Sequence, residues 1–378
     1  MSAPFSSAGA AAARCEHGGA FWNAIGDDLR TLEKRAGVIN ADVLDAWFPP
    51  SPRIIAAIEP HLEWLIRTSP PTGCEGMIRC IAECRDLDAR CVLPGDGSSA
   101  LIFLAFREWL ISASRALVLD PSYGEYAHVL EQVVGCSVER FALARADGFQ
   151  VDVAQLARRL ADGYDVVVIV NPNSPTGRYV SRAELERVLA AAPARTRFWI
   201  DETYIDYAGA GESLERFAAS RPNVVVAKSM SKVYALSGLR AAYLVAAPSI
   251  IESLARRTPP WAVSLPAQVA AIEALRDTSY YESRWNETHT LRAEFADTLG
   301  SRLSFAVTPS VANFILCQLP SAGPAAEIVC ERARARGLYL RDTSSMSQQL
   351  GRHSIRIAVK DWDTNQRILE ILAACVSP

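Results

Sequence analysis

The sequence predicts an α/β fold with two parts: a large domain whose mostly parallel sheet is flanked by helices, and a smaller α+β C-terminal domain. Short apolar runs alternate with amphipathic helical stretches from about residue 92 to 247, which is typical of parallel sheets covered on both faces. After about residue 266 a few short strand-like runs lie among longer helical stretches instead. The chain has 378 residues and is 50% hydrophobic, which suffices for two hydrophobic cores.

We therefore expect an N-terminal arm over 1–50, a large domain over 51–265 and a small domain over 266–378. In the last part, helices are expected near 267–300 and 323–336, and strands at 313–317, 338–340 and 354–359.

Within the large domain, the apolar run Cys91–Pro94 leads into the small-residue stretch Gly95–Phe103. A helix is expected to start at Ser98 or Ser99. A glycine-rich turn before a helix N-terminus can bind a phosphate, although such turns are also common without a ligand.

Two further strands are expected, at Ala116–Leu119 and Asp165–Val170. The first leads to Tyr123, which can stack on a ligand ring or simply pack in a turn. The second leads to Asn171–Gly177, where two prolines and a glycine form a rigid turn. Asparagine side chains on this turn can hydrogen-bond a ligand, but taken alone the pattern favours an ordinary loop. Ser181 is expected to cap the helix that follows.

The next apolar strand starts at Arg197 and ends at Asp201. A carboxylate there can supply the counter-charge for a protonated ring nitrogen, or it can cap a helix. Tyr204 lies close enough in sequence to contact the same ligand.

The strand-like run Val224–Val226 leads into Ser229-Met230-Ser231-Lys232, and Arg240 follows. A lysine can form a Schiff base with an aldehyde, while an arginine and hydroxyl groups hold a phosphate dianion. Pyridoxal 5'-phosphate carries both groups, so the pattern indicates this cofactor. A single lysine is usually a surface charge, and the prediction therefore depends on the other segments.

The polar residues that end these strands are expected to form one site. The carboxyl ends of parallel strands meet at one edge of a sheet, where ligands bind. Asp120, Asn171, Asp201 and Ser229 all fall at such ends.

In this order the segments resemble the fold-type I pyridoxal-phosphate enzymes of the class I/II aminotransferase family. Within it the chain is most similar to the branch of histidinol-phosphate aminotransferase and threonine-phosphate decarboxylase, from about His17 to the C-terminus. The resemblance implies that Lys232 is the Schiff-base lysine and proton shuttle. It also implies that Asp201 pairs with the pyridine nitrogen, Tyr204 bonds the phenolic oxygen and Tyr123 stacks on the ring. The implied phosphate ligands are Ser98, Ser99, Ser229, Ser231 and Arg240.

The resemblance extends to substrate binding. His353–Val359 is similar to the family strand whose arginine binds the substrate carboxylate, which implies that role for Arg356. From pattern alone, an outward-facing strand arginine is the preferred interpretation of Arg356. Arg341 lies in a segment similar to one that contacts a distal anion in the decarboxylase, and His17 in one similar to its His-Gly-Gly.

The sequence departs from the pattern of this branch in three places. Ser174 stands where the branch has an asparagine, so either Asn173 replaces it or Tyr204 alone bonds the phenolic oxygen. The stretch Arg67–Gly73 lacks the branch's Tyr-Pro pair, and Asp45–Pro52 replaces an asparagine-rich substrate segment. We therefore expect a substrate other than histidinol phosphate or threonine phosphate.

The expected function is a pyridoxal-phosphate-dependent aminotransferase acting on an amino acid, with a distal anion suggested by Arg341. A carboxylate held by Arg356 in the ring plane favours cleavage of Cα–H over loss of CO2. The alternatives are a decarboxylase, another specialised lyase or oxidase, and a relative that binds the cofactor without turnover. A nucleotide-binding protein fits less well, because neither a Gly-x-Gly-x-x-Gly turn nor a P-loop is present.

The composition limits location and partners. A net charge of −3 offers no basic field for nucleic acid. The nine cysteines include no Cys-x-x-Cys pair, and with five histidines they give no zinc pattern, so we expect no metal site and reduced thiols in a cytoplasm. No apolar stretch reaches the length of a membrane span, and the first residues lack the features of a signal peptide. The resemblance implies a homodimer.

Overall fold

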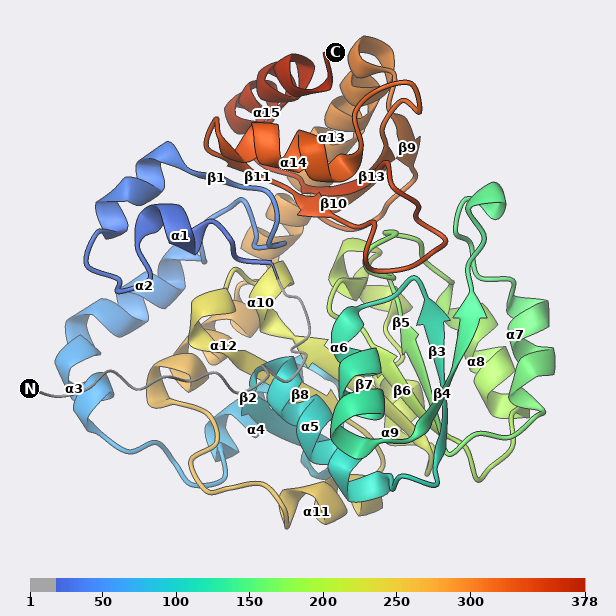
Figure 1. Ribbon diagram of the computed structural model, residues 1–378. Coiled ribbons are helices and arrows are strands. Elements are labelled where there is room, and N and C mark those ends of the chain that lie inside the picture. Colours follow the sequence, from blue (N-terminus) through green and yellow to red (C-terminus); the bar gives the residue numbers. More distant parts are fainter. Residues whose placement is uncertain (1–17, 378) are drawn as a thin grey trace, which may run out of the picture.

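The computed structural model describes residues 18–377 (Figure 1). Its centre is a seven-stranded sheet with the order β2-β8-β7-β6-β5-β3-β4. Strand β8 runs antiparallel to both of its neighbours, and the other strands are parallel where they pair. The strands are β2 (Val92–Asp96), β3 (Arg115–Asp120), β4 (Ser137–Ala142), β5 (Val166–Val170), β6 (Arg197–Asp201), β7 (Val224–Ser229) and β8 (Ala241–Val245). The predicted α/β class with a mostly parallel sheet is confirmed.

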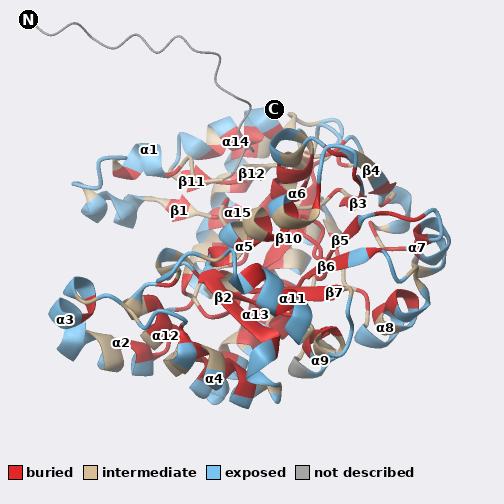
Figure 2. Cartoon of the chain, turned by 90° about the horizontal axis from the view of Figure 1, so that it is seen from below, coloured by how far each residue is buried: buried red, intermediate tan, exposed pale blue. Residues whose placement is uncertain are grey.

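The central strands are buried on both faces, as their continuous apolar runs predict. Along β5, Val167 and Ile169 belong to one core, whereas Val166, Val168 and Val170 belong to a second core on the opposite face. The first core includes side chains of α4 (Glu75–Arg85), α7 (Val153–Leu160), α8 (Arg182–Ala191), α9 (Glu215–Ala219) and α12 (Leu265–Arg276). The second includes those of α5 (Gly97–Trp109), α6 (Gly124–His128) and α11 (Pro248–Ala255). Figure 2 shows the buried strands between helices whose outer surfaces are exposed.

Local sequence signals explain several boundaries. Ser181 and Glu184 form a capping box at the start of α8, as the predicted cap requires. Helix α5 begins at Gly97, just before the expected Ser98 or Ser99. Gly97 has a φ of 80°, a conformation that glycine adopts without steric cost.

The C-terminal part contains a four-stranded antiparallel sheet with the order β12-β13-β10-β9. Its strands are β9 (Ala306–Thr308), β10 (Phe314–Gln318), β12 (Arg341–Asp342) and β13 (Ser354–Ala358). In Figure 1, α13 (Thr278–Leu303), α14 (Ala326–Arg334) and α15 (Trp362–Val376) lie together over this sheet.

The N-terminal segment is attached to this C-terminal part. It contains α1 (Trp22–Ile25), α2 (Pro52–Ile58), α3 (Leu62–Arg67) and β1 (Ile39–Asn40), and β1 pairs in parallel with β11 (Leu338–Tyr339). Helix α12, just beyond the expected boundary at residue 265, packs against α2 and α4. The division into 1–50, 51–265 and 266–378 stays a proposal, and this packing favours a small domain that starts after α12.

No helix between residues 18 and 377 is both long and apolar enough to cross a membrane.

Candidate active site

A cavity of about 160 Å³ opens where β5, β6 and β7 end. Val170, Asp201 and Ser229 are the last residues of these three strands, and all three line it. This is the edge at which the sequence placed a ligand. The complete lining is Ser98, Ser99, Tyr123, Val170, Ser174, Asp201, Thr203, Tyr204, Ser229, Ser231, Lys232 and Arg240.

Lys232 lies on α10 (Met230–Val233), the short helix that directly follows β7. Ser229 caps this helix, and the Lys232 Nζ donates to Oδ1 of Asp45 at 2.8 Å. Burial lowers the pKa of Lys232, and the charge and hydrogen bond of Asp45 act in the opposite direction. A partly buried lysine with a lowered pKa is suited to nucleophilic chemistry.

The other lysine of this segment lies elsewhere. Lys228 is buried within β7, and its Nζ lies 3.1 Å from Asp206 and 3.7 Å from Glu202. The structure therefore distinguishes a lysine that lines the cavity from one held in a buried ionic network.

Arg240 and the start of α5 form a cradle for an anion. The Arg240 Nη1 is 3.5 Å from Ser231 Oγ, and a Cβ added to Gly97 would lie only 2.3 Å from Nη2. The guanidinium thus lies against the positive end of a helix, an arrangement that an intervening anion would stabilise. Ser98 and Ser99, in the first turn of α5, also line the cavity.

Asp201 is held by three donors. The backbone N and Oγ1 of Thr203 lie 2.9 and 2.6 Å from its Oδ1, and the Tyr126 hydroxyl donates to Oδ2 at 2.7 Å. Burial raises the pKa of Asp201, and these hydrogen bonds together with the charge of Lys228 oppose that rise. A buried carboxylate at this depth favours a cationic partner such as a protonated ring nitrogen.

Tyr126 is a residue that the sequence did not single out. It accepts a hydrogen bond from Trp199 Nε1 at 2.9 Å while it donates to Asp201. It follows Tyr123 by less than one helical turn, and the sequence offered no signal to tell which tyrosine faces the carboxylate.

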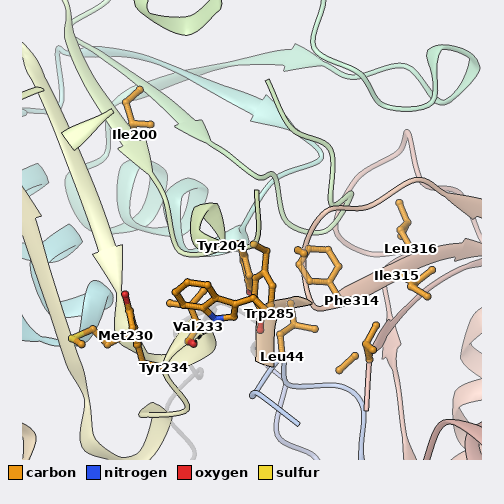
Figure 3. Packing of buried hydrophobic residues seen from close by; sticks show 14 of the residues in the cluster. Leu44, Ile200, Tyr204, Met230, Val233, Tyr234, Trp285, Phe314, Ile315 and Leu316 are labelled. Atoms are coloured by element: carbon orange, nitrogen blue, oxygen red, sulfur yellow. Dashed lines mark hydrogen bonds between the residues drawn. The ribbon is translucent and has the colours of Figure 1, made fainter. Parts of the chain in front are cut away.

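Aromatic side chains border the cavity. Tyr204 packs edge-on against Phe314 of β10, with ring centroids 5.2 Å apart, and thus joins the large sheet to the small one (Figure 3). Burial raises the pKa of Tyr204, and the charge of Arg356 opposes this. Tyr123 also lines the cavity and packs edge-on against Tyr126.

The turn after β5 presents Ser174, and not Asn173, to the cavity. The Asn173 amide donates to the carbonyl of Pro121 and to Thr176 Oγ1, both at 3.0 Å, and its Oδ1 is 3.3 Å from Ser122 Oγ. Its hydrogen-bonding groups are thus engaged within the turn. The expectation that Asn173 replaces the family asparagine stays a prediction, and the geometry favours the alternative of Tyr204 alone.

Arg356 is buried on β13, so it is not the outward-facing strand arginine that the pattern also allowed. Its Nη1 donates to Ser174 Oγ at 3.1 Å and its Nη2 to the carbonyl of Asp42 at 3.0 Å. Its Nε has no hydrogen-bond partner among the described residues. A buried guanidinium bonded only to neutral groups is well suited to bind a carboxylate.

Arg341 lies directly opposite Arg356 in the register of β12 and β13. Residues opposite each other in an antiparallel pair place their side chains on the same face. Arg341 lines a second cavity, of about 190 Å³, together with Asp42, Arg334 and Tyr339. His17 lies outside the described residues.

The donors around the first cavity match the groups of pyridoxal 5'-phosphate. The Arg240 cradle would hold the phosphate, Asp201 the pyridine nitrogen and Lys232 the aldehyde carbon, and Tyr123 and Tyr204 would contact the ring. The cradle that a Cβ at Gly97 would fill and the buried carboxylate of Asp201 both favour this fit.

Comparison of the sequence with known proteins supports the same cofactor. The family model "Aminotransferase class I and II" matches residues 67–372. The histidinol-phosphate aminotransferase of Rhodopseudomonas palustris strain BisB18 is 28% identical over 333 residues, which cover 86% of this chain and 88% of that protein. The one from Methanocella arvoryzae is 31% identical over 284 residues, 75% of each chain.

Solved structures share the fold. Histidinol-phosphate aminotransferase from Clostridium acetobutylicum gives a TM-score of 0.79 at 23% identity, covering 88% of this chain and 98% of that one. The Sinorhizobium meliloti enzyme, in complex with pyridoxal-5'-phosphate, gives 0.78 at 19%, covering 88% of each. L-threonine-O-3-phosphate decarboxylase from Porphyromonas gingivalis gives 0.74 at 22%, covering 89% and 99%. The chain belongs to the class I and II aminotransferase family, and it is a pyridoxal-phosphate-dependent transferase.

Proposed function

We propose that the protein transaminates an amino acid that carries a second, distal anionic group, with Lys232 as the lysine that binds the cofactor and moves the proton at the substrate's Cα. The observation that carries this proposal is the pair of arginines on one face of the small sheet. Arg356 is buried beside the first cavity, and Arg341 lies opposite it and lines the second.

Arg356 would bind the α-carboxylate. Its two Nη atoms already donate to neutral oxygens, and its Nε has no hydrogen-bond partner in the part of the chain that the structure describes. A carboxylate fixed in this way fixes the orientation of the bonds at Cα. Bound pyridoxal phosphate withdraws electrons from Cα, which weakens the bonds there. With the carboxylate held by Arg356, Cα–H is the bond exposed to Lys232.

Arg341 would bind the distal anion. The charge of Arg341 acts to lower the pKa of Arg356, a lowering whose main cause is burial. Two guanidinium groups on one face repel each other, and a substrate with two anionic groups relieves this repulsion. The curated relatives bear the name of a phosphate-carrying substrate. The replaced segment at 45–52 supports a different carbon skeleton in this protein.

Decarboxylation is the second candidate. The observation that favours it is again Arg341, because the matching arginine segment belongs to the decarboxylase side of the branch. The fold similarity to the Porphyromonas gingivalis protein is of the same order as that to the aminotransferases.

One experiment separates the two. The holoenzyme is offered single amino acids with and without a distal acid, together with a keto-acid acceptor, while keto acid and CO2 are measured. We expect a keto acid and no CO2, with the diacids and phosphoamino acids preferred. Release of CO2 without keto acid would overturn transamination in favour of the decarboxylase.

We also propose a homodimer in the cytoplasm. Apolar side chains are exposed on α2, α3 and the loop before α12, including Ile66 at 72%, Trp261 at 55% and Trp64 at 51% relative exposure. A groove between α4 and α11, lined by Cys74, Ile78, Leu93 and Pro260 among others, adjoins them. A second copy of the chain would cover this surface. Analytical ultracentrifugation tests the dimer, and a monomer at micromolar concentration would contradict it.

A further inference from the structure

Among residues 18–377, Asp45 is the only hydrogen-bond partner of the Lys232 ammonium group. Its Oδ1 lies 2.8 Å from the Lys232 Nζ and 2.6 Å from the Ser237 Oγ. The Lys232 side chain is 18% exposed and that of Asp45 is 37% exposed. This ion pair is therefore partly shielded from solvent, and it lies at the atom on which the proposed chemistry depends.

The backbone around Asp45 is fixed from both sides. The carbonyl of Leu44 accepts from Asn313 Nδ2 at 3.0 Å, and the Asn313 carbonyl in turn accepts from the backbone N of Val359 at 2.9 Å. On the other side, Trp47 Nε1 donates to Thr288 Oγ1 at 2.8 Å. The segment around Asp45 is therefore anchored to Asn313, which directly precedes β10, and to Thr288 on α13.

The charge of a second lysine, Lys360, also acts on this carboxylate. Lys360 directly follows Val359, and Asn365 holds its backbone at both N and O, at 2.9 and 2.7 Å. Burial lowers the pKa of Lys360 to about 8, while the charge of Asp45 raises it and that of Lys232 lowers it. The chain has only four lysines, Lys34, Lys228, Lys232 and Lys360, and the charges of two of the four act on the Asp45 carboxylate.

Charged groups from three different segments act on Lys232. Burial lowers its pKa, Asp45 raises it, and Arg356 and Arg240 lower it. Burial acts to raise the pKa of Asp45, but the charges of Lys232 and Lys360 and the hydrogen bonds to Lys232 and Ser237 lower it overall. Asp45 is thus the anion that offsets an otherwise cationic environment.

We infer that Asp45 is a positioning residue for Lys232: it holds the amino group of the lysine at the mouth of the cavity and stabilises its ammonium form whenever the lysine is not bound to the cofactor. This inference rests on the proposed role of Lys232. The charge of Lys360 also favours the ionised form of Asp45.

The arrangement fits the proton transfer. A neutral Lys232 amine removes the proton from the substrate's Cα, so a C–H bond breaks and an N–H bond forms, with the electron pair remaining with the substrate. The new ammonium group lies beside Asp45, which offsets its charge. The same group then returns the proton as an acid. A carboxylate partner raises the pKa of this acid, and the three surrounding cations restrain that rise.

The test measures the pKa of Lys232 in the full-length protein freed of its cofactor. The pH dependence of acetylation by trace acetic anhydride is followed for each lysine by mass spectrometry, with exposed Lys34 as the internal reference. In Asp45→Asn we expect the pKa of Lys232 to fall by about one unit, which is about tenfold faster labelling at a fixed pH below the pKa. Asp42→Asn is the matched control, because Asp42 lies on the same segment and does not contact Lys232. An unchanged pKa in Asp45→Asn would overturn the inference.

Two further variants distinguish the proposed effect on the pKa of Lys232 from a folding defect. Ser237→Ala removes a competing donor from Asp45, so the pKa of Lys232 should rise, a change opposite to that of Asp45→Asn. Asp45→Glu should restore the wild-type value in part. A general loss of structure cannot move this pKa in both directions.

Steady-state kinetics of the holoenzyme add a second readout. Asp45→Asn should lower kcat about tenfold with little change in KM, because the substrate contacts are intact. A rise in KM of about tenfold with an unchanged kcat would instead assign Asp45 to substrate binding and overturn the positioning role. Borohydride reduction of the holoenzyme shows separately which lysine binds the cofactor. If it marks Lys232 while Asp45→Asn leaves the pKa unchanged, only this inference fails; if it marks Lys228 or Lys360, the proposed role of Lys232 fails.

Discussion

Arg341 and Arg356 face each other across β12 and β13, with their side chains on the same face of the small sheet. Arg356 is buried at 9% relative exposure, and Arg341 lines the neighbouring cavity. Opposed like charges destabilise a strand pair, so this pairing is expected where a ligand supplies the anions. The arrangement suits a substrate with two anionic groups.

Replacing Arg341 should therefore affect only substrates with a distal acid. We expect Arg341→Met to raise KM for them about tenfold to a hundredfold, since a charge-assisted hydrogen bond contributes about 1.5–3 kcal/mol. Neutral amino acids should react as before. Arg336→Met is the control, because this exposed arginine on the same connection bonds only a backbone carbonyl. An equal loss for neutral and acidic substrates would remove Arg341 from the distal site.

Gly97→Ala should weaken cofactor binding. A Cβ at this position would lie 2.3 Å from Arg240 Nη2, and the φ of 80° strains any other residue. Gly135→Ala separates the two effects, because Gly135 has a φ of 79° and no atom within 4 Å of an added Cβ. We expect both variants to lose about 1 kcal/mol of stability. Only Gly97→Ala should lose cofactor affinity, measured by fluorescence titration with pyridoxal phosphate. Equal affinities in the two variants would argue against a phosphate site at Arg240.

Tyr126→Phe should disturb the hydrogen bonds that hold the Asp201 carboxylate. It leaves Trp199 Nε1 buried without an acceptor and removes one donor from Asp201, at a cost of about 1–3 kcal/mol of unfolding free energy. The lost donor should also raise the pKa of Asp201, and cofactor affinity should fall with it. Tyr164→Phe serves as the control, since Tyr164 donates to Glu139, which is partly exposed. Urea denaturation and cofactor titration measure the two effects. Wild-type stability and wild-type cofactor affinity would show that Tyr126 does not support Asp201.

The sequence predicted the part of the site that lies at strand ends. Each of β5, β6 and β7 is a continuous apolar run, so its end, and therefore Asp201, Ser229 and the nearby Lys232, could be located from the pattern alone. Asp45 and Tyr126 could not be found in this way. Asp45 reaches Lys232 from a segment far away in sequence, and its position depends on backbone contacts with Asn313 that no periodicity reveals. The turn after β5 shows the same limit, since a single residue of register decides whether Asn173 or Ser174 faces the cavity.

With only four lysines, the cofactor-binding lysine can be identified without ambiguity. Borohydride reduction followed by peptide mass spectrometry should place the cofactor on Lys232, and Lys232→Ala should lose both this label and turnover. Lys34→Ala is the control, because Lys34 is exposed and remote from the cavity. A label that persists in Lys232→Ala would show that another lysine carries the cofactor.

Lys360 makes a specific prediction about pH and stability. Its pKa in the folded protein is about 8, below the 10.5 of an ordinary lysine, because burial disfavours its charge. Between these two values the unfolded chain binds more protons than the folded one, so the contribution of Lys360 to stability rises with pH across that window. Below about pH 8, Lys360 is protonated in both the folded and the unfolded protein, so the full free-energy cost of burying its charge remains. Lys360→Met should thus be more stable than the wild type near neutral pH, and this advantage should shrink as the pH rises toward about 10. Urea denaturation of both proteins at about pH 7 and about pH 9.5 measures the difference, with Lys34→Met as the exposed control. A difference that is constant with pH would mean that Lys360 titrates as an ordinary lysine, and that Asp45 alone compensates its burial.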